Sequence, residues 1–343
     1  MRSDVGVGRY SRLTRVHAAS AAAFVYPLGP LVGSGGDVPL ALLVAVALIG
    51  VLGHTYGCTV NDLADLASDR LNPARRRSVL VSGAITVGAA RGALAVQLCA
   101  AAVLTAGALT AGDGARWPWI LGVAALFGSI TLSNIYQKRR IAHPLAMDAL
   151  FGVNMGVPAL LCCTVAASED LAPAALVALA FGLHMALLNI VAGNLKDLEH
   201  DRSVGDDTTA LRLGVRVTEG RHVLATVPYT VLVHLVLAAS AAALLALATT
   251  APAPGWQRAV AAVVVVALQA VAACSVGNLL RRRRTVDPRG RELYLGLNFF
   301  SLMASAFLWA PAGVITVTLL TAAWLPMTRR LVTMPADEQE RAA

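Results

Sequence analysis

Ten long apolar stretches follow one another along this chain, and few charged residues interrupt them. A helix that crosses the hydrocarbon core of a bilayer needs about 20 predominantly apolar residues, and most of the stretches are that long. Only 14% of the 343 residues are charged, whereas a soluble domain carries about 25%. The sequence therefore predicts an all-α, polytopic membrane helical bundle. The stretches cover residues 16–33, 38–60, 86–111, 117–136, 144–166, 172–194, 222–249, 257–280, 292–309 and 312–327.

The positive charges are distributed unevenly between the two sides of the predicted bundle. If the N-terminus is cytoplasmic and the spans alternate, 25 of the 28 Lys and Arg residues fall on the cytoplasmic side. Lys and Arg in short cytoplasmic loops are the bias that orients membrane proteins. The net charge of +8 therefore reflects topology, and we expect no nucleic acid partner. We predict a multi-pass protein of the cytoplasmic membrane.

The chain is expected to have nine or ten spans in a single transmembrane domain, residues 1–332. The last two apolar stretches could form one broken helix or a tight hairpin that turns at Pro311. Arg329 and Arg330, which follow them, favour the hairpin and a cytoplasmic C-terminus. The polar tail, residues 333–343, is expected to be disordered.

Acidic residues gather directly after the second apolar stretch, in NDLADLASDR (residues 61–70). If the helix continues, Asn61, Asp65 and Asp69 lie one turn apart on one face. Asp62 lies about 100° further round the helix and can lean toward the same opening. This cluster and a second one, described next, each follow a span that ends on the cytoplasmic side. An active site formed by the two clusters would therefore face the cytoplasm.

A second cluster, NLKDLEHDR (residues 194–202), follows the sixth apolar stretch. Asp197 and Asp201 are one turn apart, Asn194 precedes them, and Glu199 is expected to face solvent. Carboxylates this close repel each other, more strongly where the dielectric is low. Ligands that are all oxygen favour a hard cation, Mg²⁺ before Ca²⁺. The two clusters therefore predict two halves of a magnesium and diphosphate site.

Basic residues lie on the same predicted face as the acidic clusters. Arg can bind phosphate oxygens through two parallel hydrogen bonds, and Lys binds them as a point charge. A diphosphate on a long apolar tail would suit this arrangement, with its head among the charges and its tail among the helices. The basic residues of this face are Arg70, Arg75, Arg76, Arg77, Lys138, Arg139, Lys196 and Arg202.

These residues resemble the motifs of a known family, the UbiA superfamily of intramembrane prenyltransferases. NDLADLASDRLN resembles its NDxxDxxxD motif, and NLKDLEHDRSVGDDTTALRLG resembles its second motif, DxxxD followed by Gly and T-x-x-x-R-x-G. NPARRRSVLVSGAIT and SNIYQKRRIAHPLAMD are similar to two further segments of the family. In the first of these, Val79 or Val81 stands where the family usually has Pro. The resemblance covers residues 15 to about 325.

The resemblance implies a bundle of usually nine spans around a central cavity, with two Mg²⁺ ions and an isoprenyl diphosphate between the two motifs. It implies that one group of residues holds metal: Asp62, Asp65, Asp69, Asp197 and Asp201. The catalytic residues implied are Asp65, Asp69, Asp197 and Asp201, with Tyr136 beside the cation or the acceptor. The residues expected to bind the diphosphate are Asn61, Arg70, Arg77, Lys138, Arg139, Asn194, Lys196 and Arg202.

Three functions remain open at this point. The first is transfer of the isoprenyl group to a separate lipophilic acceptor, expected to be aromatic or quinone-like. The second is a terpene cyclase of the same superfamily, in which the prenyl chain attacks itself; the intact NDxxDxxxD motif favours transfer. The third is an ion-coupled transporter. It is disfavoured because a transporter would carry charges near the middle of its spans, whereas these Asp residues cluster at helix ends.

Overall fold

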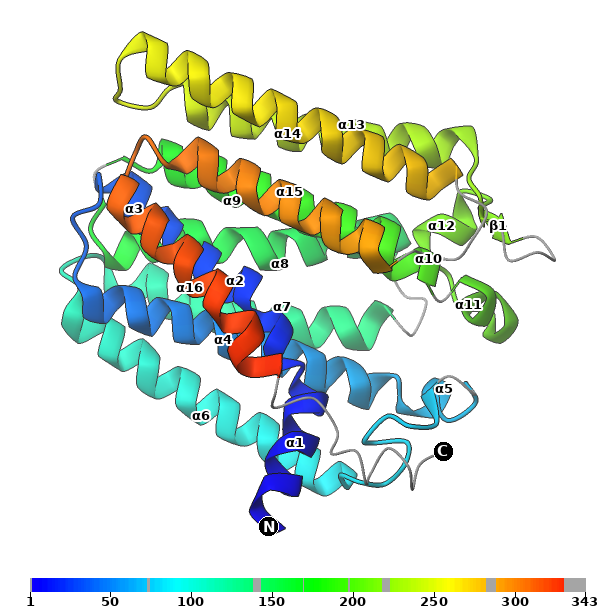
Figure 1. Ribbon diagram of the computed structural model, residues 1–343. Helices are drawn as coiled ribbons and strands as arrows, with labels where there is room; N and C mark the ends of the chain where they lie inside the picture. Colours follow the sequence, from blue (N-terminus) through cyan, green and yellow to red (C-terminus); the bar gives the residue numbers. More distant parts are fainter. Residues whose placement is uncertain are drawn as a thin grey trace.

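The computed structural model describes residues 2–72, 75–137, 143–168, 170–196, 198–217, 223–281 and 288–329. These residues form a bundle of long helices (Figure 1), and their β-structure is one antiparallel pair, β1 (Arg216–Val217) and β2 (Val223–Leu224). Helical structure satisfies backbone polar groups within each segment, as a lipid environment requires. The long helices are α4 (Leu40–Ala64), α6 (Val87–Ala111), α7 (Arg116–Gln137), α8 (Pro144–Val165), α9 (Ala172–Leu188), α13 (Val227–Thr249), α14 (Gly255–Arg281), α15 (Pro288–Ala306) and α16 (Pro311–Arg329).

The first apolar stretch is not one helix but a series of short ones. After α1 (Arg2–Thr14), the chain turns at Arg15 and continues as the 3₁₀ helix η1 (Val16–Ala19). The series then runs through α2 (Ser20–Val25) and α3 (Leu28–Gly33). Pro27 separates these two helices, because proline has no backbone N–H to donate within a helix.

Nine segments of the described residues are long and apolar enough to cross a membrane, by length and composition. The predicted integral membrane fold is confirmed. The predicted ninth stretch forms α15, whose apolar part, Gly296–Ala306, is shorter than a span. The chain turns after α15 and α16 begins at Pro311, which is the predicted hairpin. The qualifying segments are Val16–Gly33, Leu40–Ala64, Val87–Ala111, Arg116–Ile135, Pro144–Val165, Ala172–Lys196, Val227–Thr249, Gly255–Asn278 and Pro311–Thr328.

The predicted start of the seventh span at residue 222 is wrong. Val223 and Leu224 are apolar, but they form β2, and α13 begins only at Val227. Pro228 lies in the first turn of α13, where its missing N–H costs nothing and its fixed φ suits a helix. Apolar character alone therefore misplaced this helix end.

Helices α8 and α9 pack through glycines. A Cβ added to Gly152 would lie 2.5 Å from the backbone oxygen of Gly182, and one added to Gly156 would lie 2.2 Å from that of Ala178. Gly152 and Gly156 form a GxxxG pattern, which lets two membrane helices approach closely. This packing holds α8 against the helix that leads into the second acidic cluster.

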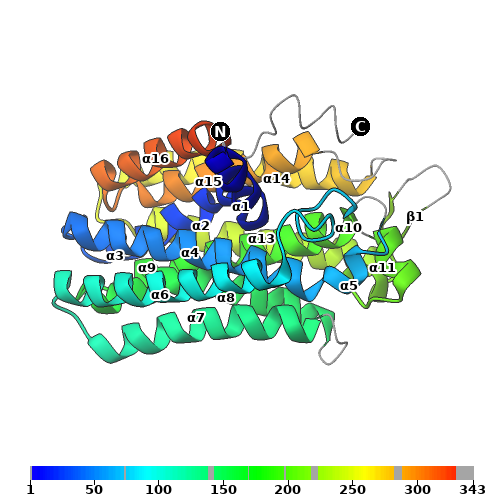
Figure 2. The same cartoon turned by 90° about the horizontal axis from the view of Figure 1, so that it is seen from below.

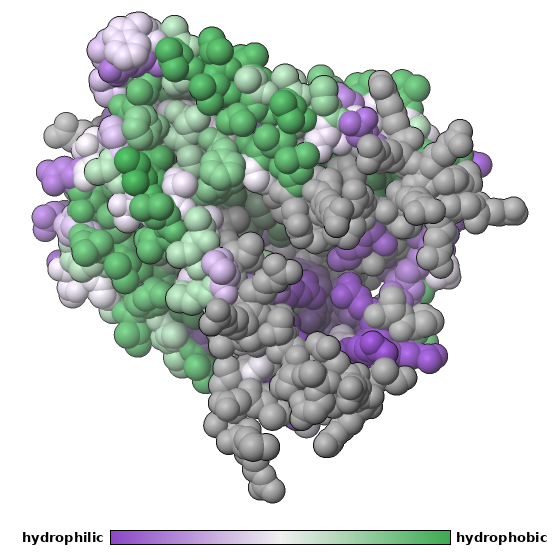
Figure 3. Space-filling model, viewed as in Figure 1, coloured by the Kyte–Doolittle hydropathy of each residue, from purple (hydrophilic) through white to green (hydrophobic). Residues whose placement is uncertain are grey.

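The charged segments lie together at one end of the bundle. Figure 2 shows α5 (Leu66–Asp69) and α11 (Leu198–Val204) at the same end. In Figure 3, apolar residues cover much of the visible helical surface, whereas hydrophilic residues gather around a recess at this end. At the other end the connections are short, and Ala115 N donates to Thr164 O at 2.7 Å. The fold therefore places both predicted motifs at one face.

Candidate active site

The first acidic cluster continues the path of α4 with little interruption. The backbone N–H of Asp65 donates to Asn61 O at 2.9 Å, and that of Asp69 donates to Asp65 O at 2.8 Å. These are bonds of helical spacing across the junction of α4 and α5. The side chains also meet, because Asn61 Nδ2 donates to Asp65 Oδ2 at 3.1 Å. The predicted register of this face is thus present in the structure.

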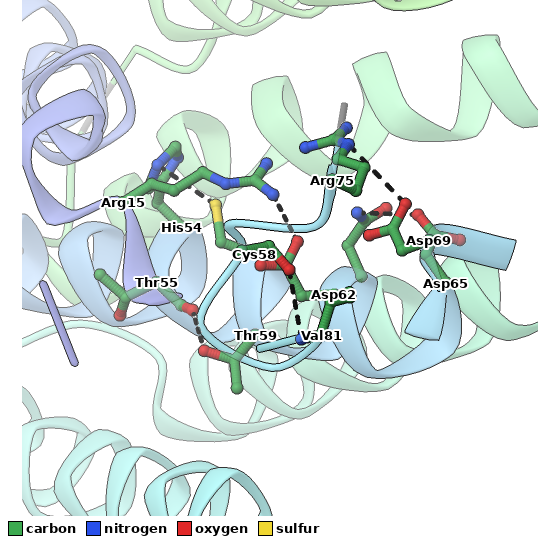
Figure 4. Close-up of polar contacts among 12 residues, drawn as sticks. Arg15, His54, Thr55, Cys58, Thr59, Asp62, Asp65, Asp69, Arg75 and Val81 are labelled. Atoms are coloured by element: carbon green, nitrogen blue, oxygen red, sulfur yellow. Dashed lines mark hydrogen bonds and ion pairs between the residues drawn. The ribbon is translucent and has the colours of Figure 1, made fainter. Parts of the chain in front are cut away.

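Asp62 points away from the other two aspartates, toward the N-terminal segment. The guanidinium of Arg15 donates to Asp62 Oδ1, and Figure 4 shows this pair beside the neighbouring carboxylates of Asp65 and Asp69. Burial lowers the pKa of Arg15, but the charges around it, first that of Asp62 and then those of Cys58, Asp65 and Asp69, together raise that pKa more, so it lies above its ordinary value. Arg15 therefore stays charged, and it brings a cation to the acidic cluster.

The segment after α5 folds back over the cluster. Arg75 Nε lies 3.7 Å from Asp69 Oδ1, and the Arg75 side chain is 31% exposed. The predicted diphosphate-binding residues Arg70 and Arg77 are exposed in this same segment. Cationic side chains and carboxylates thus alternate around the end of α4, as binding of both a metal ion and a phosphate would require.

The second acidic cluster follows a change in helix type. α9 passes into the π-helix η3 (Asn189–Gly193), then α10 (Asn194–Lys196), and α11 begins at Leu198. π-Helical turns are rare and occur often at functional sites. A Cβ added to Gly193 would lie 2.5 Å from Asn189 Oδ1. Glycine at that position therefore leaves room for the Asn189 side chain.

Asp148 on α8 holds the second cluster in place. Its carboxylate accepts hydrogen bonds from Asn189 Nδ2 at 2.7 Å, Asn194 Nδ2 at 3.4 Å and Thr209 Oγ1 at 2.5 Å. Asp148 is 1% exposed. These three donors belong to η3, α10 and α12 (Thr209–Arg212), so one buried carboxylate connects three elements of the second motif.

The end of the second motif is built by local contacts. Thr208 caps α12 by accepting from Leu211 N at 3.4 Å, and Arg212 forms an ion pair with Asp207 at 2.7 Å. Gly214 has φ +80°, a conformation that suits glycine after a helix. Thr208, Arg212 and Gly214 thus determine the local conformation at the end of the second motif.

The two acidic clusters meet through α5 and α11. Ser68 Oγ lies 3.2 Å from His200 Nε2, although the two residues are 132 positions apart in sequence. Asp69 directly follows Ser68, and Asp201 directly follows His200. Glu199 is exposed, as predicted. The contact brings together the ends of the two motifs.

Among the described residues, no group of three or more His, Cys, Asp or Glu is close enough to hold a metal ion by itself. Mg²⁺ commonly takes only one or two protein carboxylates and completes its shell with water and substrate phosphates. The described carboxylates at the site, Asp62, Asp65, Asp69 and Asp201, supply oxygen ligands alone. This donor set fits a hard cation held jointly with a phosphate.

The remaining predicted residues are placed as follows. Asn194 is buried and donates to Asp148, whereas Lys196 and Arg202 are exposed at the charged end. Asp197, Lys138 and Arg139 lie outside the described residues, as does the predicted tail, and the side chain of Tyr136 is not described. The assignment of metal and diphosphate ligands therefore stays a prediction.

Sequence reasoning missed three residues of this site. In the sequence, Arg15 contributes to the cytoplasmic charge bias and His200 lies between two acidic residues, but neither pattern predicts a role in the site. Asp148 closes the segment SNIYQKRRIAHPLAMD. Its signal was available, because a single carboxylate inside an apolar span needs hydrogen-bonding partners.

Comparisons with known proteins agree with this architecture. A model of the UbiA prenyltransferase family matches residues 22–285. A curated relative, the 4-hydroxybenzoate octaprenyltransferase of Albidiferax ferrireducens, is 32% identical over 130 residues, which cover 37% of this chain and 40% of the relative. The matched part of the chain thus spans less than half of that relative's length.

Solved structures show the same fold. A UbiA homolog from Archaeoglobus fulgidus bound to GPP and Mg²⁺ has a TM-score of 0.61 at 15% identity, covering 95% of this chain and 100% of that one. The apo structure of a UbiA homolog from Aeropyrum pernix K1 has a TM-score of 0.60 at 21% identity, covering 88% and 98%. At these sequence identities the structural similarity shows only a shared fold, whereas the match to the family model shows family membership. The chain belongs to the UbiA prenyltransferase family.

Proposed function

We propose that this protein transfers an isoprenyl group from a prenyl diphosphate to a lipophilic acceptor within the membrane. The observation that carries the proposal is the contact between Ser68 on α5 and His200 on α11 at 3.2 Å. It brings two acidic motifs from distant parts of the chain to one face of an apolar bundle. A substrate with a multiply charged anionic head and a hydrocarbon tail matches that arrangement.

We assign the metal-binding role to the carboxylates of the two motifs, with Mg²⁺ as the ion and two ions as the number. The Archaeoglobus fulgidus homolog, which shares this fold, was solved with GPP and Mg²⁺, and this supports the assignment. When bound, a divalent cation neutralises developing charge on phosphate oxygens. The residues of this chain that would hold it are Asp62, Asp65, Asp69, Asp197 and Asp201.

The cationic residues of the site stabilise the leaving group. Arg15 and Arg75 lie beside the acidic cluster, and we assign Arg70, Arg77, Lys138, Arg139, Lys196 and Arg202 to the diphosphate as well. The bond between C1 of the prenyl chain and the diphosphate oxygen breaks, and both bonding electrons leave with the oxygen. Fixed positive charge favours this step because it acts where negative charge develops.

The allylic cation formed in this way needs protection from water. The apolar helices provide it, since a water-excluding site prevents hydrolysis of a reactive intermediate. A carbon or oxygen nucleophile of the acceptor then forms the new bond at the cation, and the acceptor loses a proton. We place Tyr136, at the end of α7, next to the cation or the acceptor.

We propose an aromatic or quinone-like acceptor. The relative from Albidiferax ferrireducens is named for transfer to 4-hydroxybenzoate, an aromatic acid, which supports this class. We also propose that the site faces the cytoplasm, because 25 of 28 Lys and Arg residues fall on that side of the predicted topology.

The test is an assay of detergent-purified protein with prenyl diphosphates of several chain lengths, with and without aromatic acceptors. Pyrophosphate release that needs both Mg²⁺ and an acceptor is the expected result. A cyclised hydrocarbon product formed without any acceptor would replace transfer by the cyclase reaction. Absence of pyrophosphate release with every diphosphate and acceptor would overturn the proposal.

A further inference from the structure

The last helix of the bundle crosses the broken first span. α16 packs on η1 and α2, and Figure 1 shows it lying over the N-terminal helices. Trp324, in the last two turns of α16, donates its indole N–H to the backbone oxygen of Val16 at 2.9 Å. Its ring also forms a T-shaped pair with that of Phe24, with centroids 5.8 Å apart and an interplanar angle of 75°. The C-terminal helix α16 therefore contacts and fixes the junction between α1 and η1.

That junction has an unusual backbone. Arg15 has φ +49°, which non-glycine residues rarely adopt and which persists where the surrounding structure supports it. The support comes from its neighbours. Ala18 N donates to Arg15 O at 2.8 Å, the guanidinium of Arg15 donates to Asp62 on α4, and Trp324 holds Val16. We call residues 15 and 16, together with these contacts, the elbow.

The elbow determines where the Arg15 guanidinium lies. From it the side chain reaches across α4 to Asp62 (Figure 4). His54 and Cys58, whose polar atoms are 3.6 Å apart, lie on the same face of α4, two turns and one turn before Asp62, respectively. Among the hydrogen bonds and ion pairs of the described residues, the guanidinium of Arg15 makes one, to Asp62. A rotation of the elbow would therefore withdraw Arg15 from the acidic cluster.

We propose that Trp324 is a positioning residue for the diphosphate site. Its indole N–H fixes Val16, the elbow keeps its left-handed turn, and Arg15 is held beside Asp62, where a phosphate arrives. The role rests on the proposed function of the site. It makes the C-terminal helix a part of substrate binding although Trp324 itself touches no substrate.

The chain offers a matched control in the same hairpin. Trp309, in the turn between α15 and α16, also donates its indole N–H to a backbone oxygen, that of Leu247, at 2.8 Å. This bond lies at the end of the bundle opposite the acidic motifs. Trp324→Phe and Trp309→Phe therefore remove equivalent hydrogen bonds and keep an aromatic ring, but only the first touches the elbow.

The first experiment measures KM and kcat for a prenyl diphosphate in both variants. For Trp324→Phe we expect KM to rise on the order of tenfold, with a smaller change in kcat. The variant loses the one hydrogen bond to Val16 that orders the Arg15 guanidinium, and the loss of one such bond corresponds to about this change in affinity. Trp309→Phe should leave both constants unchanged. In an Arg15→Gln background, Trp324→Phe should cause no further rise in KM, because the two residues act through one contact. Equal KM values for the two Trp variants would overturn the proposal, as would a full further rise in the Arg15→Gln background.

The second experiment separates failure of this role from failure of the proposed function. We expect trypsin to cleave after Arg15 when the elbow opens, so that the cleavage rate follows the population of the open form. Mass spectrometry of the detergent-solubilised protein should show faster cleavage after Arg15 in Trp324→Phe than in wild type or Trp309→Phe. This readout needs no substrate. Identical cleavage in all three proteins would show that Trp324 does not hold the elbow, whatever reaction the protein catalyses.

Discussion

Replacing Asp148 by Ala tests how the second motif is held. The substitution removes the acceptor of three hydrogen bonds inside the bundle. Bonds to a charged group are each worth about 1.5–3 kcal/mol, and two of the three are short. The bond at 3.4 Å contributes little, because it lies beyond ordinary hydrogen-bond distances. Two bonds thus suggest about 3–6 kcal/mol.

Part of that energy is offset, because burying a carboxylate has its own desolvation cost. A net loss of about 3 kcal/mol in the free energy of unfolding is therefore expected for Asp148→Ala, or roughly 5 °C in the thermal midpoint of a chain this long. Activity should fall more steeply. Once η3 and α12 lose their common anchor, the second motif shifts, and a displacement of about 1 Å can cost about 100-fold in rate.

Thermal unfolding in detergent and Mg²⁺-dependent pyrophosphate release measure the two effects. Asp170→Ala is the control. Asp170 is exposed at the opposite end of the bundle and accepts one hydrogen bond, from Ala172 N at 2.8 Å, so its loss should cost about 1 kcal/mol or less. If Asp148→Ala kept both the wild-type midpoint and the wild-type turnover, Asp148 would not be the anchor described above.

Two further predictions concern the motifs themselves. Asp65→Ala and Asp201→Ala should each abolish Mg²⁺-dependent pyrophosphate release while the protein is still expressed and inserted, whereas the exposed Glu199→Gln should change it little; near-normal release in either Asp variant would contradict the assignment of metal ligands. Gly193→Ala should lower the thermal midpoint, because its methyl group would meet a side-chain oxygen of η3 at 2.5 Å and overpacking costs about 1–3 kcal/mol. Gly107→Ala, whose methyl group would meet no atom of a neighbouring segment within 4 Å, should not lower the midpoint, because alanine also favours the helix interior.

The parts of the fold that follow from hydropathy and helical periodicity could be predicted from the sequence. The spans, the hairpin before α16 and the register of Asn61 and Asp65 are of this kind. Each depends on interactions within one segment, namely the length of an apolar run, the start of a helix at proline, or a spacing of four residues. Such local interactions are written in consecutive residues, so reading the chain in order recovers them.

The rest depends on contacts between segments that are distant in sequence. η3 forms where Asn189 turns toward Asp148, 41 positions earlier, and nothing in the letters NIVAG distinguishes a π-turn from an α-turn. The left-handed Arg15 is stabilised by residues from α4 and α16, the latter about 300 positions away. Apolar composition also places the start of the seventh span before the true start of α13, because β2 is apolar but not helical. Tertiary contacts of this kind override local preference.

The two halves of the site are supported by separate sets of contacts. Asp62 is approached by Arg15 from the elbow that Trp324 holds, whereas the second motif rests on Asp148 inside the bundle, and the two supports share no residue. Effects of independent sites add within about 0.5 kcal/mol. The losses in the free energy of unfolding caused by Trp324→Phe and Asp148→Ala should therefore sum in the double variant. The halves meet in the described residues at Ser68 and His200. A double variant that loses clearly less than the sum would mean that this contact transmits the displacement of one motif to the other, so that the site yields as one unit.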